Sequence, residues 1–123
     1  MPWSHQAARS HRTRERWVEE YQSGEWERLH TLQEFGRYSL IAGYVRRLGS
    51  GLRILDVGCG NGPLMEELRP LGNTYVGCDL APPAIQRALE SAGSNELLLV
   101  ADAEKLPFGP GSFDVVVCNE VLN

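Results

Sequence analysis

Residues 52–64 read Leu-Arg-Ile-Leu-Asp-Val-Gly-Cys-Gly-Asn-Gly-Pro-Leu, and this stretch decides the fold. The run at 52–57 is too short for a helix and is apolar on both faces, as a central parallel strand buried by helices would be. Three alternating glycines follow, where positive φ is allowed and a ligand can approach the backbone. Pro63 suits the first turn of a helix, because its missing N–H would be unpaired there. The order of strand, glycine turn and helix start predicts a nucleotide-type binding crevice.

The same alternation of apolar runs and helical segments continues to residue 123. Three further runs predict strands at Asn73–Cys78, Glu96–Ala101 and Phe113–Cys118. Helices are expected at 63–69 and 82–91, each opening on proline. Apolar strands that alternate with helices form right-handed crossovers in a parallel sheet. We therefore expect an α/β fold with a Rossmann-like parallel sheet and amino-terminal covering helices.

The region before the glycine stretch divides into two parts. Residues 1–16 are arginine-rich and are expected to form a basic, flexible tail. Residues 17–50 show an interrupted helical pattern, with expected breaks at Gly24 and Gly36, and form a helical cover. Most aromatic residues of this cover are expected to pack on the domain, and the candidates for lining a substrate pocket instead are Trp17, Tyr21, His30 and Tyr38. Residues 51–123 form the partial binding domain.

Composition excludes several classes of protein. The 123 residues suffice for one domain, and 42% hydrophobic with 23% charged residues is ordinary for a soluble globular protein. The net charge of -4 gives no reason to expect a nucleic-acid partner. No apolar run approaches the roughly 18 residues that span a bilayer. Three cysteines without metal-ligand spacing predict neither a disulfide framework nor a metal site, and favour a cytoplasmic location.

Polar side chains stand where each expected strand ends. They are Asp56, Asp79, Asp102 and Asn119 with Glu120. Because the carboxyl ends of parallel strands meet at one edge, we expect these side chains to converge. An acid some 20 residues beyond the glycines is placed to accept hydrogen bonds from both hydroxyls of a ribose. The glycine order is Asp-x-Gly-x-Gly-x-Gly rather than G-x-G-x-x-G, which disfavours a nicotinamide oxidoreductase.

Residues 56–62, Asp-Val-Gly-Cys-Gly-Asn-Gly, resemble motif I of the class I S-adenosylmethionine-dependent methyltransferases. Residues 75–80 are similar to the family's second strand with its ribose-binding acid. Residues 101–108 and 111–118 are similar to the adenine-contacting segment and fourth strand of the small-molecule branch often called type 11. The resemblance covers residues 52–123, in the right order and spacing.

The resemblance implies a site for S-adenosylmethionine and its product S-adenosylhomocysteine. The glycines would bring backbone to the methionine part, with carbonyls near Gly58 and Cys118 meeting its amino group. Asp79 would hold the ribose, Leu80 would pack on the adenine, and Asp102 with the Ala103 N–H would bind the adenine edge. Asp56 would order the glycine loop, or reach the cofactor amino group through a water. The expected cofactor-binding residues are Asp56, Gly58, Cys59, Gly60, Gly62, Asp79, Leu80, Asp102, Ala103, Cys118 and Asn119.

The resemblance also implies a small-molecule methyl acceptor, while the acceptor, the general base and any catalytic residue stay unassigned. Arg37 is a candidate for the cofactor carboxylate, and Asp114, at the start of the fourth strand, is expected to be structural. No metal is expected.

Family members carry three further strands, whereas this sequence ends at Asn123. We therefore expect an exposed fourth strand that pairs with a second copy or a partner chain. We also expect cofactor binding without efficient turnover. The alternative is a non-catalytic nucleotide-binding or assembly module that acts through that strand.

Overall fold

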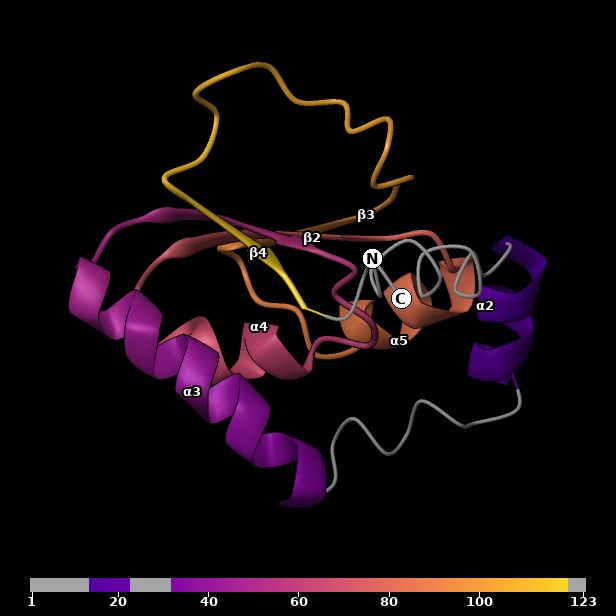
Figure 1. Ribbon diagram of the computed structural model, residues 1–123, viewed down its shortest axis with the longest axis horizontal. Helices are drawn as coiled ribbons and strands as arrows, with labels where there is room; N and C mark the ends of the chain where they lie inside the picture. Colours follow the sequence, from indigo (N-terminus) through magenta and orange to yellow (C-terminus); the bar gives the residue numbers. More distant parts are fainter. Residues whose placement is uncertain (1–13, 23–31, 120–123) are drawn as a thin grey trace, which may run out of the picture.

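The computed structural model describes residues 14–22 and 32–119, and within them a parallel sheet carries helices on one face (Figure 1). In chain order the elements are α2 (Arg14–Gln22), α3 (Leu32–Leu48), β1 (Arg53–Val57), α4 (Pro63–Leu68), the 3-10 turn η2 (Arg69–Leu71), β2 (Thr74–Asp79), α5 (Pro82–Leu89), β3 (Glu96–Val100) and β4 (Val115–Cys118).

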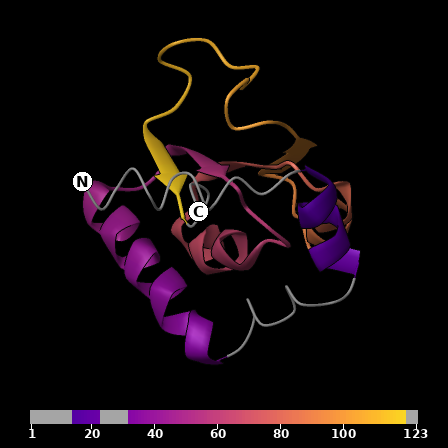
Figure 2. The same cartoon turned by 45° about the vertical axis from the view of Figure 1, so that its right-hand side comes forward.

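The strands lie in the order β3-β2-β1-β4, and every pairing is parallel. Helices α3, α4 and α5 lie against one face, with α2 beside α5, and the long loop from β3 to β4 arches over the other face (Figures 1 and 2). Helices α4 and α5 lie in the connections from β1 to β2 and from β2 to β3, as expected for the crossovers of a parallel sheet. The predicted α/β class and the Rossmann-like parallel sheet are confirmed.

Strand β1 lies inside the sheet and is covered on both faces. Ile54 points into the cluster beneath the helices, beside Leu64 and Met65 of α4. Leu55 and Val57 point into a second cluster on the opposite face. The continuous apolar run at 52–57 therefore reflects burial on two sides, as expected for a strand of this kind.

The opposite face has only a partial cover. Loop residues Leu106, Phe108 and Phe113 pack on it, and the two phenylalanine rings meet edge to face at 5.0 Å between centroids. Beyond their reach, Leu97 of β3 and Val116 of β4 remain 59% and 57% exposed. The described part of the chain thus has one complete helical layer and one open sheet face.

Helix α3 corrects one expectation, because it runs without a break through Gly36. Its residues Tyr38, Ala42 and Val45 are buried on the core, and this packing outweighs the cost of about 1 kcal/mol for a helical glycine. A side chain at Gly36 would meet nothing within 4 Å, so no contact requires glycine there.

The predicted boundaries shift at other places. Helix α2 begins at Arg14, inside the segment 1–16 that was expected to be a tail. Strand β4 begins at Val115 rather than Phe113, because Asp114 is occupied by Arg53 and Phe113 packs with the loop. Residues 1–13, Gly24, Trp26, His30 and Glu120 lie outside the described residues, and the side chains of Trp17 and Tyr21 are not described. The domain division stays a prediction.

None of the described helices combines the length and the apolar character needed to cross a membrane.

Substitution Ile54→Ala should lower the free energy of unfolding by about 2–5 kcal/mol, because the side chain is fully buried between β1 and α4. Substitution Leu97→Ala is the control, since this apolar strand residue is exposed and should change stability by less than about 1 kcal/mol. Urea denaturation followed by circular dichroism measures both. Equal losses in the two variants would contradict the assigned core.

Candidate functional site

The glycine loop after β1 is tied to the end of β2 by backbone hydrogen bonds. The N–H groups of Gly58 and Cys59 both donate to the carbonyl of Cys78, at 2.8 and 2.9 Å. The chain then turns through Gly58, Gly60 and Gly62 with φ of 76°, 61° and 92°. These are the left-handed conformations predicted from the sequence, and they bring loop backbone to the carboxyl edge of the sheet.

Gly62 has a second reason to be glycine. A Cβ there would lie 3.0 Å from Cε of Met65 and 3.5 Å from Cβ of Ala88, so the loop packs tightly against α4 and α5. Pro63 opens α4 directly after it, as predicted. The glycine loop is therefore fixed both by packing against helices α4 and α5 and by hydrogen bonds to the end of β2.

Asp79 joins the two loops that follow β1 and β2. Its Oδ2 accepts the N–H of Gly60 at 3.0 Å, and its Oδ1 accepts the N–H of Ala81 at 3.0 Å. Burial raises the pKa of Asp79, and the backbone hydrogen bonds oppose that rise. A carboxylate has about four lone-pair positions, so this one retains capacity to accept hydroxyl groups.

Asp56 lies deeper, with 2% of its surface exposed. The hydroxyl of Tyr75 donates to its Oδ2 at 2.6 Å. The pKa of Asp56 is raised to about 7, because burial raises it, the Tyr75 hydrogen bond only partly opposes that rise, and the nearby Asp79 charge adds to it. The expectation that Asp56 orders the glycine loop is not met by any described hydrogen bond; the Cys78 carbonyl and Asp79 do so instead.

The segment after β3 starts beside Asp79, because the N–H of Ala101 donates to the Asp79 carbonyl at 3.0 Å. Asp102 follows with an exposed side chain whose Oδ1 accepts the N–H of Glu104 at 2.9 Å. Ala103 is exposed and Leu80 is half-buried. The predicted adenine-binding residues thus stand next to the predicted ribose-binding acid, at the surface.

Cys118 ends β4 opposite Val57, and the half-buried Asn119 follows it. Desolvation and the Asp56 charge raise the pKa of the Cys118 thiol. Cys59 is buried, and burial with the surrounding acids raises its pKa well above the ordinary value. These thiols stay protonated near neutrality, which does not suit a nucleophilic role.

Sequence reasoning missed two buried residues at this edge. The side chain of Asn61 is buried in the glycine loop, and its Oδ1 has no described hydrogen-bond donor. Tyr75 holds Asp56 from the neighbouring strand. The sequence did contain a sign of the role of Tyr75, because Gly77 lies two positions later on the same face of the strand and leaves room for a large ring. Nothing in the sequence distinguished Asn61 from an exposed loop residue.

Two charged residues considered in the sequence form ion pairs within the chain. Asp114 forms an ion pair with Arg53 at 3.1 Å where β1 and β4 begin, which agrees with the structural role expected for it. Arg37 pairs with Glu34 at 3.0 Å within α3.

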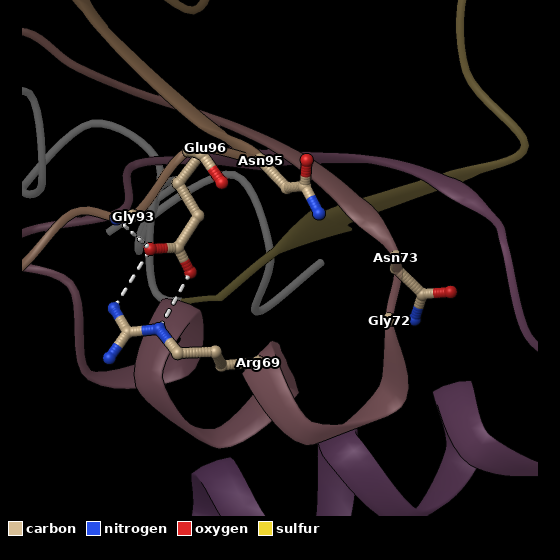
Figure 3. A pocket seen from close by; sticks show the side chains of 7 residues that line it. Arg69, Gly72, Asn73, Gly93, Asn95 and Glu96 are labelled. Carbon is tan, nitrogen blue, oxygen red and sulfur yellow. Dashed lines mark hydrogen bonds and ion pairs between the residues drawn. The ribbon is translucent and has the colours of Figure 1, made fainter.

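A hollow of about 180 Å³ lies at the amino ends of β2 and β3, around the ion pair of Arg69 and Glu96 (Figure 3). It is at the opposite edge of the sheet from the glycine loop.

The side chains at the carboxyl edge of the sheet suit a ligand that donates hydrogen bonds from hydroxyl and ammonium groups. These side chains offer acceptors, from Asp56, Asn61 and Asp79. No group of three or more metal-ligating side chains occurs in the described ranges. The residues present therefore fit an adenosyl ligand with a charged amino group.

A family model described as a methyltransferase domain matches residues 55–123. The chain belongs to this family. The match begins within β1 and includes the glycine loop, Asp79 and Asp102, so the predicted class I, type 11 resemblance is confirmed.

Relatives and solved structures agree with that family. A ubiquinone biosynthesis O-methyltransferase of Thiobacillus denitrificans is 40% identical over 77 residues, which are 59% of this chain and 33% of that protein. An S-adenosylmethionine-dependent methyltransferase structure from Mesorhizobium loti is 29% identical with a TM-score of 0.53, over 60% of this chain and 36% of that one. The [4+2]-cyclase SpnF is 26% identical with a TM-score of 0.59, over 65% and 32%. The matched region thus spans about a third of these proteins.

Substitution Asp56→Asn should make stability less dependent on pH. Asp56 has a pKa of about 7 when folded and about 4 when unfolded, so its stabilising contribution is complete below pH 4 and is lost as pH rises through 7. Asparagine does not titrate, so the variant does not lose stability at this position as the pH rises. Its free energy of unfolding relative to the original chain should therefore increase between pH 4 and 8, by on the order of 4 kcal/mol.

Urea denaturation at several pH values measures this difference. Asp114→Asn is the matched control, because ion pairing lowers the pKa of that exposed acid and places its effect below pH 4. Parallel stability curves for Asp56→Asn and the original chain would contradict the raised pKa.

Proposed function

We propose that this chain is the S-adenosylmethionine-binding portion of a methyltransferase that acts on a small-molecule acceptor. One observation carries the proposal: the Asp79 carboxylate at the end of β2 is held against the glycine loop by the Gly60 N–H. This contact supports a role for Asp79 as the acceptor of ribose hydroxyls, beside backbone suited to the methionine moiety. Membership of the methyltransferase domain family supports the same ligand.

The bound cofactor would supply a reactive sulfonium methyl group for in-line displacement by the acceptor atom. The chain's own part is alignment. Asp79 fixes the ribose, Asp102 and the Ala103 N–H recognise the adenine edge, and the loop from Gly58 to Gly62 presents backbone to the methionine end. Orientation of this kind can contribute several kcal/mol without a covalent catalyst.

The acceptor is proposed to be a small molecule, and the names of the curated relatives favour an oxygen atom as the methyl-accepting group. The ranges 14–22 and 32–119 contain no histidine, so a histidine acting as general base would come from outside them. Reduced cysteines are consistent with the proposed cytoplasmic location.

A second candidate is a nucleotide-binding or assembly module without methyl transfer. Its support is the likeness to SpnF, which is described as a [4+2]-cyclase, together with the edge of β4 that has no partner strand among the described residues. In this candidate the crevice binds the adenosyl ligand and function lies in the interaction surface.

Isothermal titration calorimetry should show S-adenosylhomocysteine binding to the chain, and no binding of NAD. Asp79→Asn should weaken that binding by about tenfold to a hundredfold, because a charged acceptor is removed from the ligand and the loop. Asp114→Asn, at the opposite edge of the sheet, should leave the affinity unchanged. Preference for NAD, or equal affinity in both variants, would contradict the proposed ligand.

Strand β4 pairs on one side only within the described residues, with β1, and we propose that its other edge pairs with a second copy or a partner chain. Light scattering should then show an oligomer, and Val116→Lys should convert it to a monomer. Leu97→Lys on the other edge strand, β3, is the control, since Leu97 is equally exposed. A monodisperse monomer whose Val116 amide exchanges freely would contradict this pairing.

A further inference from the structure

The ring of Tyr75 lies against Gly77, two residues further along its own strand. A Cβ at Gly77 would lie 2.8 Å from both Cε1 and Oη of Tyr75, so the absence of a side chain at Gly77 leaves room for the ring. Leu98 of β3 closes the same space, with its Cδ2 also at 2.8 Å from that Cβ position. The tyrosine is thereby directed along the sheet toward the end of β1.

This direction brings the Tyr75 hydroxyl to Oδ2 of Asp56, at 2.6 Å. Tyr75 is 3% exposed and belongs to the cluster beneath the helices, so the phenol is fixed by packing. Burial and the neighbouring acid raise the pKa of Tyr75 well above its ordinary value, so its hydroxyl remains a donor at every physiological pH. Among the described residues, Tyr75 provides the one hydrogen bond to this carboxylate.

We propose that Tyr75 is a positioning residue of the cofactor site: it occupies Oδ2 of Asp56 and thereby directs Oδ1 toward the ammonium group of the cofactor's methionine moiety. The inference rests on the proposed function and adds a residue that contacts no ligand itself. The strand sequence Tyr75-Val76-Gly77 becomes part of the site, with Gly77 as the position that admits the ring.

The surroundings of Asp56 explain why its charge needs this support. The titratable groups that face it are Tyr75 and Asp79 from β2, Cys59 from the loop, Cys78 from the end of β2 and Cys118 from β4. Tyr38 of α3 lies in the same cluster. These groups are acids, thiols and phenols, and none brings a positive charge. A hydrogen bond from Tyr75 and an ammonium group from a ligand would stabilise the ionised carboxylate together.

The first experiment measures S-adenosylhomocysteine affinity by calorimetry between pH 5.5 and 8.5. The affinity of the original chain should fall as pH decreases through 7, because Asp56 takes up a proton. Tyr75→Phe should weaken binding about tenfold at pH 7 and move this fall to higher pH. Tyr44→Phe is the matched control, since it removes the hydroxyl of a tyrosine that is 69% exposed, and its profile should match the original chain.

The second experiment needs no ligand, so it tests the role of Tyr75 even if Tyr75→Phe binds weakly because it is less stable. Nuclear magnetic resonance of the Asp56 carboxyl carbon should give a higher pKa in Tyr75→Phe than in the original chain.

Asp56→Asn keeps an oxygen that accepts the Tyr75 hydroxyl. Its affinity for S-adenosylhomocysteine should be weaker than that of the original chain and should no longer vary with pH.

The outcomes separate the two proposals. Absence of S-adenosylhomocysteine binding by the original chain overturns the proposed function, and the role of Tyr75 in the cofactor site with it. Binding by the original chain with an identical pH profile in Tyr75→Phe overturns the inference alone. An unchanged Asp56 pKa in Tyr75→Phe overturns it as well.

Discussion

The carboxyl edge of this domain depends on one carbonyl group. The Cys78 oxygen accepts hydrogen bonds from two consecutive amides, those of Gly58 and Cys59, just where β1 ends and the chain must leave the sheet. This double contact fixes the direction of the glycine loop before any side chain contributes. Asp79, the next residue, then reaches the loop at Gly60. The position of the acid and the shape of the loop are therefore two results of the same strand pairing.

Much of this arrangement could be predicted from local patterns. The apolar run at 52–57 indicated a strand buried on both faces, and the glycine spacing indicated the left-handed turns now observed. Patterns of this kind are readable because each residue's requirement is local, such as a positive φ at Gly60. The predicted break at Gly36 was wrong for the converse reason: burial of Tyr38, Ala42 and Val45 is a tertiary effect that local propensity does not contain.

The interior of the site was the part that sequence could not supply. The family resemblance implies that Asp56 orders the loop, yet its described partner is Tyr75 on the neighbouring strand. That contact depends on register, which pairs Asp56 with Gly77 and so carries the tyrosine ring across to it. A one-residue shift would turn Tyr75 to the other face of the sheet. Register, more than composition, decides which side chains share this interior.

The long loop between β3 and β4 has a consequence for the order of folding. Ile54 pairs with Tyr75 across a separation of 21 residues, but with Val115 across 61. Closing the longer loop costs about 1 kcal/mol more in chain entropy, and no helix between β3 and β4 shortens the search. We therefore expect β1, α4 and β2 to form an early unit with the glycine turn already in place, while β4 joins last. Edge strand β4 is thus the strand that pairs with β1 across the largest separation in sequence.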